Sequence, residues 1–244
     1  MGCVGSQVQI LSSRQKKLNL FNIFFVIIGF CGGSGSGKSV LVKYAYEKLG
    51  PNNSLIISLD QYYKDFSGLK FEERCNINFD HPSSIDFDLI TNQLSELKNG
   101  NPVKIPIYSY KKHKRLKKTE ISYPKKFILV DGILIFSNKK LIELIDKKIY
   151  IQCEKEKRVK RRIKRDIKYR GRTEKEVIDR FEKNIHEMHE KYVKPHVEKV
   201  DIIINNNENL KHAKSEIDLI VESLMNEWKE QKIKYLYILK TCMP

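Results

Sequence analysis

The stretch GGSGSGKS occupies residues 32–39 and decides the fold class. Gly32, Gly37, Lys38 and Ser39 match the phosphate-loop pattern G-x-x-x-x-G-K-[ST]. An apolar run, FFVIIGF, precedes it at residues 24–30, and a helical pattern, VLVKYAYEKL, follows it. A flexible glycine-serine linker would not lie between a buried strand and a helix, so we interpret this stretch as a phosphate-binding loop.

Each residue type in this loop has a chemical purpose. Glycines let successive backbone N–H groups turn toward a phosphate, Lys38 adds a point charge, and the Ser39 hydroxyl can ligate Mg²⁺. The following helix presents its positive end to the same anion. We therefore predict binding of ATP or GTP with Mg²⁺, through Gly32, Gly33, Ser34, Gly35, Ser36, Gly37, Lys38 and Ser39.

Four more apolar runs predict further buried strands: SLIISLD (54–60), KKFILVDGIL (125–134), KKIYIQC (147–153) and VDIIINN (200–206). Helical patterns separate them, so the chain predicts an α/β fold, a doubly wound parallel sheet of about five strands of the P-loop NTPase type. Partial alternation in VKIPIYSY (103–110) and KTEISYP (118–124) predicts a β-hairpin arm at about residues 102–124.

The chain has 244 residues, which suits one domain, and we place that domain at residues 23–228. A C-terminal tail is expected at 229–244 and a basic leader at 1–22. Gly2 and Cys3 in MGCVGS fit an acylation pattern that would attach the leader to a membrane surface, although a chance match in a short arm is the alternative.

The net charge of +16 would attract polyanions, but much of it lies in lysine-rich runs that are typical of solvated surface. Nucleic acid is therefore not the expected partner. The 5 cysteines form no C-x-x-C pair, which disfavours a structural zinc site and favours a reducing, cytoplasmic compartment.

Two carboxylates follow predicted strands: Asp60 after SLIISL and Asp131 after KKFILV. The carboxyl ends of parallel strands share one edge of a sheet, where ligands bind. Together with Ser39, these carboxylates could hold Mg²⁺, and either could accept the proton of an attacking hydroxyl. Strand-end capping is the alternative.

Four arginines recur at helical spacing on one face: Arg158, Arg161, Arg162 and Arg165. The sequence RGR at residues 170–172 then interrupts the helix. Arginine binds phosphate through a planar fork, so we predict a helical, arginine-rich lid at about residues 154–173. A solvated basic face or a nuclear-import patch would show the same pattern.

The segments SLDQYY, NFDHPSSIDFD, IPIYSYKKHKR, DGIL and RRIKRDIKYRGRT occur in the order found in uridine kinases. The chain resembles this family over about residues 27–204. The resemblance implies transfer of the γ-phosphate of ATP to the 5′-hydroxyl of uridine or cytidine. It also implies a homo-oligomer, often a tetramer.

Individual roles follow from the same resemblance. Asp60 would be the catalytic carboxylate, Asp80 and Arg162 would bind the ribose hydroxyls, and Arg165 and Arg170 would attend the ATP phosphates. The rest of the nucleoside site would comprise Tyr63, Phe79, Tyr108, Tyr110, His113, Ile133, Arg172 and Arg180, with His113 reading the pyrimidine edge.

Two departures from the family's pattern leave alternatives open. Asp131 stands where such kinases usually have Glu, and Arg180 stands where they usually have Gln beside the ribose. The cationic Arg180 would suit an anionic acceptor, so a related kinase for a sugar phosphate or a pantothenate-like acceptor is one alternative. A non-catalytic nucleotide-binding homologue is another.

Overall fold

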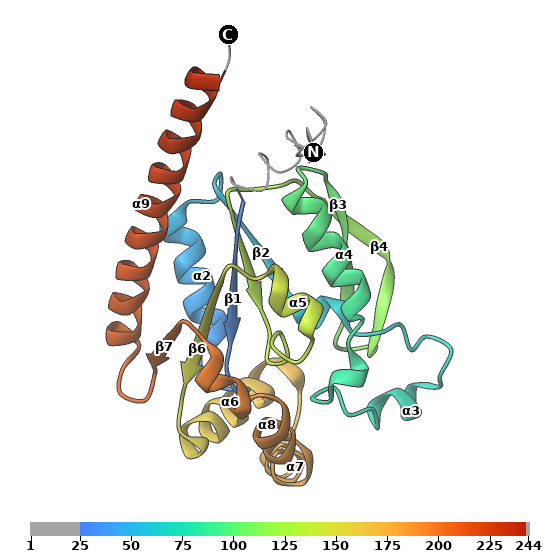
Figure 1. Cartoon of the computed structure of the whole chain (residues 1–244). Helices are drawn as coiled ribbons and strands as arrows, with labels where there is room; N and C mark the ends of the chain where they lie inside the picture. The colour runs from blue at the N-terminus through green and yellow to red at the C-terminus, as the bar shows by residue number, and fades with distance from the viewer. Residues whose placement is uncertain (1–24, 243–244) are drawn as a thin grey trace, which may run out of the picture.

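The structure is a computed structural model that describes residues 25–242. Its centre is a five-stranded parallel sheet with the strand order β2-β5-β1-β6-β7 (Figure 1). The strands are β1 (Val26–Cys31), β2 (Ser54–Ser58), β5 (Phe127–Asp131), β6 (Lys147–Gln152) and β7 (Ile202–Asn205). The predicted α/β fold with a five-stranded parallel sheet is confirmed.

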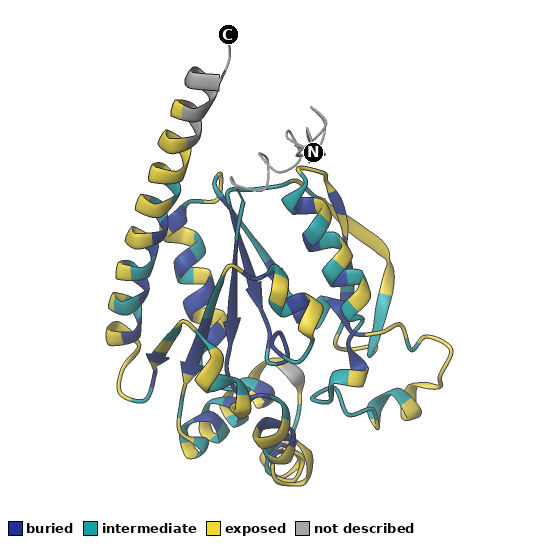
Figure 2. Cartoon of the chain, viewed as in Figure 1, coloured by how far each residue is buried: buried dark blue, intermediate teal, exposed yellow. Residues whose placement is uncertain are grey.

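Helices cover both faces of the sheet, because successive residues of a strand point to opposite faces. On β1, Ile28 packs into a core shared with α2 (Lys38–Leu49) and α9 (Leu210–Cys242). Its neighbour Ile27 packs into the second core, which includes α4 (Phe87–Lys98) and α5 (Lys139–Leu144). The two central strands β1 and β5 are accordingly buried along almost their whole length, as Figure 2 shows.

The hairpin arm consists of β3 (Val103–Ser109) and β4 (Lys114–Ser122), joined by a turn in which His113 has a φ of 47°. The second strand thus begins at Lys114, not at 118 as the alternation predicted. Lys114 pairs with Ser109 and Arg115 with Tyr108, so much of the basic connection belongs to the strand. Its charged side chains are tolerated because most of β4 is exposed to solvent.

A cluster of short helices lies at the carboxyl end of the sheet (Figure 1). α6 (Lys155–Arg170) ends at Gly171, whose φ of 64° is left-handed. The helical pattern at residues 173–193 forms three consecutive segments: α7 (Glu174–Arg180), a π-helical turn, η4 (Phe181–Ile185), and α8 (His186–Tyr192). The remaining short helices are η2 (Leu59–Tyr62), α3 (Phe71–Cys75), η3 (Pro82–Ser84) and η5 (Lys194–Lys199).

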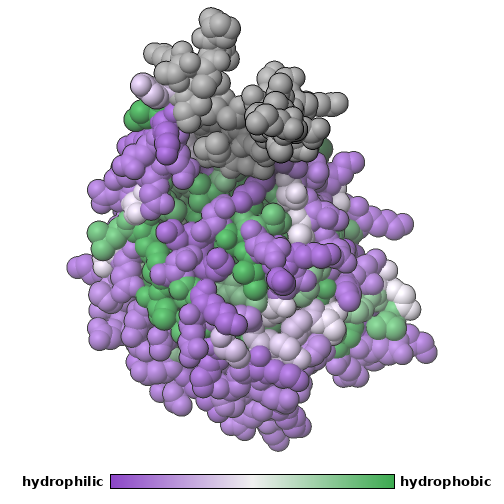
Figure 3. Space-filling view, viewed as in Figure 1, coloured by the Kyte–Doolittle hydropathy of each residue, from purple (hydrophilic) through white to green (hydrophobic). Residues whose placement is uncertain are grey.

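α9 has 33 residues and continues without interruption across residue 229, where the sequence suggested the start of a tail. Between residues 25 and 242, no helix is both long and apolar enough to cross a membrane. Hydrophilic residues dominate the face seen in Figure 3. The acylation candidates Gly2 and Cys3 lie outside the described residues.

Candidate active site

The phosphate-loop candidate joins β1 directly to α2, as predicted. Gly37 caps the helix with a φ of 90°, and Gly35 has a φ of 85°, a region that favours glycine. A Cβ on Gly35 would also lie 2.3 Å from the backbone oxygen of Arg158. The loop conformation therefore depends on glycine both for its backbone angles and for space.

The strand register brings the two predicted carboxylates to the same edge of the sheet. Asp131 is level with Phe30 of β1 on one side and with Ser58 of β2 on the other. Asp60 lies two residues after Ser58 along the chain, within η2. The carboxyl ends of three strands thus bring both acidic residues next to the loop.

Lys38 and Asp131 form a buried ion pair, in which the ammonium donates to a carboxylate oxygen. Both residues are more than nine-tenths buried. Burial by itself lowers the pKa of Lys38, but the charge and hydrogen bond of Asp131 outweigh it, so this pKa is raised. Asp131, expected as a Mg²⁺ ligand, is therefore the counter-ion of the loop lysine in this structure.

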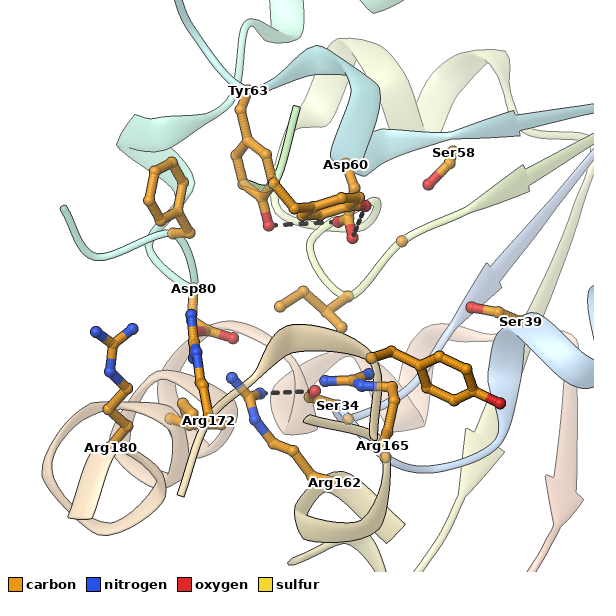
Figure 4. Close-up of a pocket in the computed structure, with 18 of the residues that line it drawn as sticks. Ser34, Ser39, Ser58, Asp60, Tyr63, Asp80, Arg162, Arg165, Arg172 and Arg180 are labelled. Carbon is orange, nitrogen blue, oxygen red and sulfur yellow. Dashed lines mark hydrogen bonds between the residues drawn. The ribbon is translucent and has the colours of Figure 1, made fainter. Parts of the chain in front are cut away.

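Asp60 is oriented by two tyrosines (Figure 4). The hydroxyl of Tyr110, at the tip of the hairpin arm, donates to one carboxylate oxygen at 3.0 Å. The hydroxyl of Tyr63 donates to the other at 3.3 Å. The two bonds fix the direction of the carboxylate, because each oxygen has its own donor.

Aromatic rings gather beside Asp60. Phe79 meets the edge of Tyr63 at 4.9 Å between centroids and stacks on His113 at 5.4 Å with an interplanar angle of 22°. Tyr108 lies 5.1 Å from Tyr63. Burial raises the pKa of both tyrosines, so they keep their protons at neutral pH. We call these four residues the aromatic group: Tyr63, Phe79, Tyr108 and His113. The aromatic group offers flat apolar surfaces with hydroxyl donors at the edges.

Arginines of α6 lie beside the phosphate loop, on the side of the pocket away from Asp60 and Tyr63 (Figure 4). Arg162 donates to the Ser34 hydroxyl at 2.7 Å, and both Arg162 and Arg165 pair with the fully buried Asp166. Arg161 donates to the backbone oxygen of Ser36 at 3.2 Å. The first half of the predicted lid is thus bound directly to the loop.

One cleft of about 1460 Å³ brings these groups together. Its lining includes the loop residues Gly33, Ser34, Gly35, Ser36, Gly37, Lys38 and Ser39, the acidic residues Asp60, Asp80 and Asp131, and Tyr63, Phe79, Tyr108, Tyr110, His113, Ile133, Arg162, Arg165, Arg172 and Arg180. Two residues predicted for the site are not among these lining residues. Gly32 is buried and does not line the cleft, and the side chain of Arg170, the last residue of α6, is not described.

Asn206 supports the phosphate loop from outside the cleft, a contact that sequence reasoning missed. Its side chain donates to the backbone oxygen of Ser36 at 2.7 Å, and its own backbone oxygen accepts from Arg161. Nothing in the run of asparagines after β7 signals this contact, because it depends on β7 lying beside β6 in the sheet. The helical spacing of the arginines did indicate the face to which Arg161 belongs.

The comparisons with known proteins agree with this geometry. Residues 27–212 match the model of the "Phosphoribulokinase / Uridine kinase family". The chain belongs to this family. It is 42% identical over 179 residues to a uridine kinase of Oceanobacillus iheyensis, covering 73% of this chain and 85% of that one. It is 39% identical over 201 residues to a uridine kinase of Staphylococcus epidermidis, covering 82% of this chain and 97% of that one.

A solved structure supports the fold alone. D-glycerate 3-kinase from Cryptococcus neoformans superposes with a TM-score of 0.55 at 18% identity, covering 76% of this chain and 88% of that one. The predicted family is confirmed, and the chain is a P-loop kinase whose phosphate donor is a nucleoside triphosphate.

Proposed function

We propose that this kinase transfers the γ-phosphate of ATP to the 5′-hydroxyl of uridine or cytidine, giving UMP or CMP. One observation carries the proposal: a single cleft contains the phosphate loop at one end and the aromatic group at the other, with Asp60 between them. The uridine kinases of Oceanobacillus iheyensis and Staphylococcus epidermidis support the choice of acceptor.

Asp60 is the proposed catalytic residue. Its carboxylate would accept the proton of the 5′-hydroxyl, and Tyr63 and Tyr110 would hold it in direction. Phosphoryl transfer depends mainly on positioning and charge neutralisation, so a strong base is not required. Three cations that line the same cleft would neutralise the phosphate oxygens: Lys38, Arg162 and Arg165.

The pyrimidine nucleoside would occupy the aromatic end. Phe79 and Tyr108 offer apolar surface for a flat base, and His113 offers ring nitrogens to its polar edge. Asp80, Arg162 and Arg172 are the proposed partners of the ribose hydroxyls, since a carboxylate and guanidinium groups suit a diol. Ile133 and Arg180 complete the lining.

The oxygen donors at the loop fit Mg²⁺, which prefers one or two carboxylates together with phosphate oxygens and water. Ser39 and Asp60 would hold the ion, and Asp131 would join them if Lys38 moved to the phosphates. The ion would supply charge neutralisation at the β- and γ-phosphates.

A sugar phosphate is the second candidate acceptor, because Arg180 adds a cation to the lining. A panel of uridine, cytidine, ribulose 5-phosphate and pantothenate, with ADP release as the readout, separates the candidates. We expect release with the two nucleosides alone. Release with a sugar phosphate and with neither nucleoside would transfer the proposal to the second candidate.

The role of Asp60 has its own test. Asp60→Asn keeps the shape and an oxygen acceptor but removes the base, so turnover should fall about 10²- to 10⁴-fold while ATP affinity changes less than about threefold. Asp65→Asn, on an exposed turn outside the cleft, is the matched control and should keep wild-type turnover. Undiminished turnover in Asp60→Asn would remove this residue from the mechanism.

We also propose a cytoplasmic location and a homotetramer, on the strength of the family alone. Light scattering after size-exclusion chromatography tests the tetramer, since a monomer at micromolar concentration would contradict it. Membrane attachment through Gly2 and Cys3 remains a prediction, and mass spectrometry of the N-terminal peptide from a eukaryotic host would test it.

A further inference from the structure

Arg158 packs against the phosphate loop but does not line the cleft. It belongs to the start of α6 and is 3% exposed. A Cβ on Gly33 would lie 2.1 Å from its Nη1 atom, so the guanidinium packs directly against the backbone of the loop. The backbone oxygen of Arg158 would lie 2.3 Å from a Cβ on Gly35. Because Arg158 does not line the cleft, it contacts the loop from outside the cleft.

Among the described residues the guanidinium makes no ion pair, and Glu190 and Glu156 act on its charge only from beyond ion-pair distance. In the described part of the chain, no carboxylate lies within ion-pair distance of Arg158, and its Nε and Nη1 atoms have no hydrogen-bond acceptor. Its nearest aromatic contact is the ring of Phe181, at 5.9 Å from the guanidinium carbon. Burial lowers its pKa, yet arginine retains its charge at neutral pH because its ordinary pKa is so high.

Its neighbours on the same helix behave differently. Arg161 and Arg162 attach α6 to the loop through hydrogen bonds to Ser36 and Ser34. Among the described residues, the side chain of Arg158 donates no such hydrogen bond, so it brings a positive charge to the loop without a bond that holds the helix there. A buried charge that lacks a partner is unfavourable, and an anion brought to the front of the loop would relieve it.

We propose that Arg158 is a positioning residue whose fixed positive charge acts on the triphosphate through the backbone of the phosphate loop. The nucleotide then supplies the counter-ion that Arg158 does not find within ion-pair distance among the described residues, so binding energy is gained from a charge that is otherwise unfavourable. The proposal rests on nucleotide binding at the loop and is independent of the acceptor.

The magnitude follows from Coulomb's law. Across a few ångströms of loop backbone, at an effective dielectric constant of about 20, opposite charges still attract by more than thermal energy. We expect removal of the charge to weaken ATP binding about tenfold. Nucleotide phosphates carry more charge in ATP than in ADP, so binding of ADP should weaken less.

The test compares three variants of the full chain. Arg158→Met removes the charge and keeps a long apolar side chain, and Arg158→Lys keeps the charge. Lys160→Met removes one charge from an exposed position of the same helix and is the matched control. Calorimetry gives the affinities for ATP and ADP without any acceptor, and thermal unfolding gives the midpoint of the ligand-free protein.

For Arg158→Met we expect an unchanged or higher ligand-free midpoint, because an unpaired buried charge is removed, together with about tenfold weaker ATP binding. Arg158→Lys should bind ATP within about threefold of wild type, and Lys160→Met should match wild type. A purely structural residue would instead give a lower ligand-free midpoint in Arg158→Met with ATP affinity unchanged.

Two results would overturn the proposal: Arg158→Met that binds ATP as tightly as wild type, or Arg158→Lys that binds it as weakly as Arg158→Met. Neither result bears on the acceptor, since no acceptor is present. If wild type binds ATP but phosphorylates neither uridine nor cytidine, the proposed function fails while the role of Arg158 stands.

Discussion

His189 should make the protein less stable in mild acid. This residue of α8 is 8% exposed, and its Nδ1 atom is buried without a partner among the described residues. Burial, followed by the nearby charge of Arg158, lowers its pKa from 6.5 to about 4. The unfolded chain therefore takes up a proton near pH 6.5, whereas the folded chain takes it up only near pH 4.

The free energy of unfolding must then fall as the pH is lowered from 6.5 to 4, because the unfolded state binds more protons there. The difference between 6.5 and about 4 corresponds to about 3 kcal/mol at about 1.4 kcal/mol per pKa unit. Most of this loss, about 2 kcal/mol, should occur between pH 7 and pH 4.5.

Urea unfolding at a series of pH values measures the effect in wild type and in His189→Gln, which cannot take up the proton. The gap between their unfolding free energies should change by about 2 kcal/mol in favour of the variant between pH 7 and pH 4.5. His212→Gln, at an exposed position of α9, is the control and should follow wild type. Parallel curves for wild type and His189→Gln would refute the reasoning.

Two further predictions concern the cleft. Asp131→Asn leaves the buried Lys38 without its counter-ion and should lower the free energy of unfolding by about 2 kcal/mol in urea, whereas Asp218→Asn, in an exposed pair, should cost less than about 1 kcal/mol. Phe79→Ala removes the central ring and should raise the KM for uridine about tenfold with the KM for ATP unchanged. Phe66→Ala, whose ring touches Phe79 outside the cleft, should keep both constants, and equal effects of the two variants would contradict the base-binding role.

The sheet was predictable because strands buried on both faces must be continuously apolar, and five such runs are visible in the sequence. The location of Asp60 and Asp131 was predictable for a related reason. Residues that follow parallel strands meet at one edge of the sheet. Their place after a predicted strand was therefore enough to predict that they lie close together.

Pairings between side chains were not predictable in the same way. Lys38 and Asp131 are 93 residues apart and form an ion pair. The sequence predicted that Lys38 contacts phosphate and that Asp131 contacts Mg²⁺, but it did not predict that they contact each other. The contact of Asn206 with Ser36 spans 170 residues and depends on the order of strands in the sheet. The start of β4 was misplaced because a solvent-exposed strand can carry lysines that conceal its alternation.

The hairpin arm has a consequence for how this protein can diversify. Tyr108, Tyr110 and His113 come from the arm, whereas the phosphate loop and Asp131 belong to the sheet. The arm is a separate two-stranded sheet, so its sequence can change without altering the pairing of any central strand. Exchange of this one segment is therefore a route by which a kinase can acquire a new acceptor while the residues that bind the donor nucleotide stay the same.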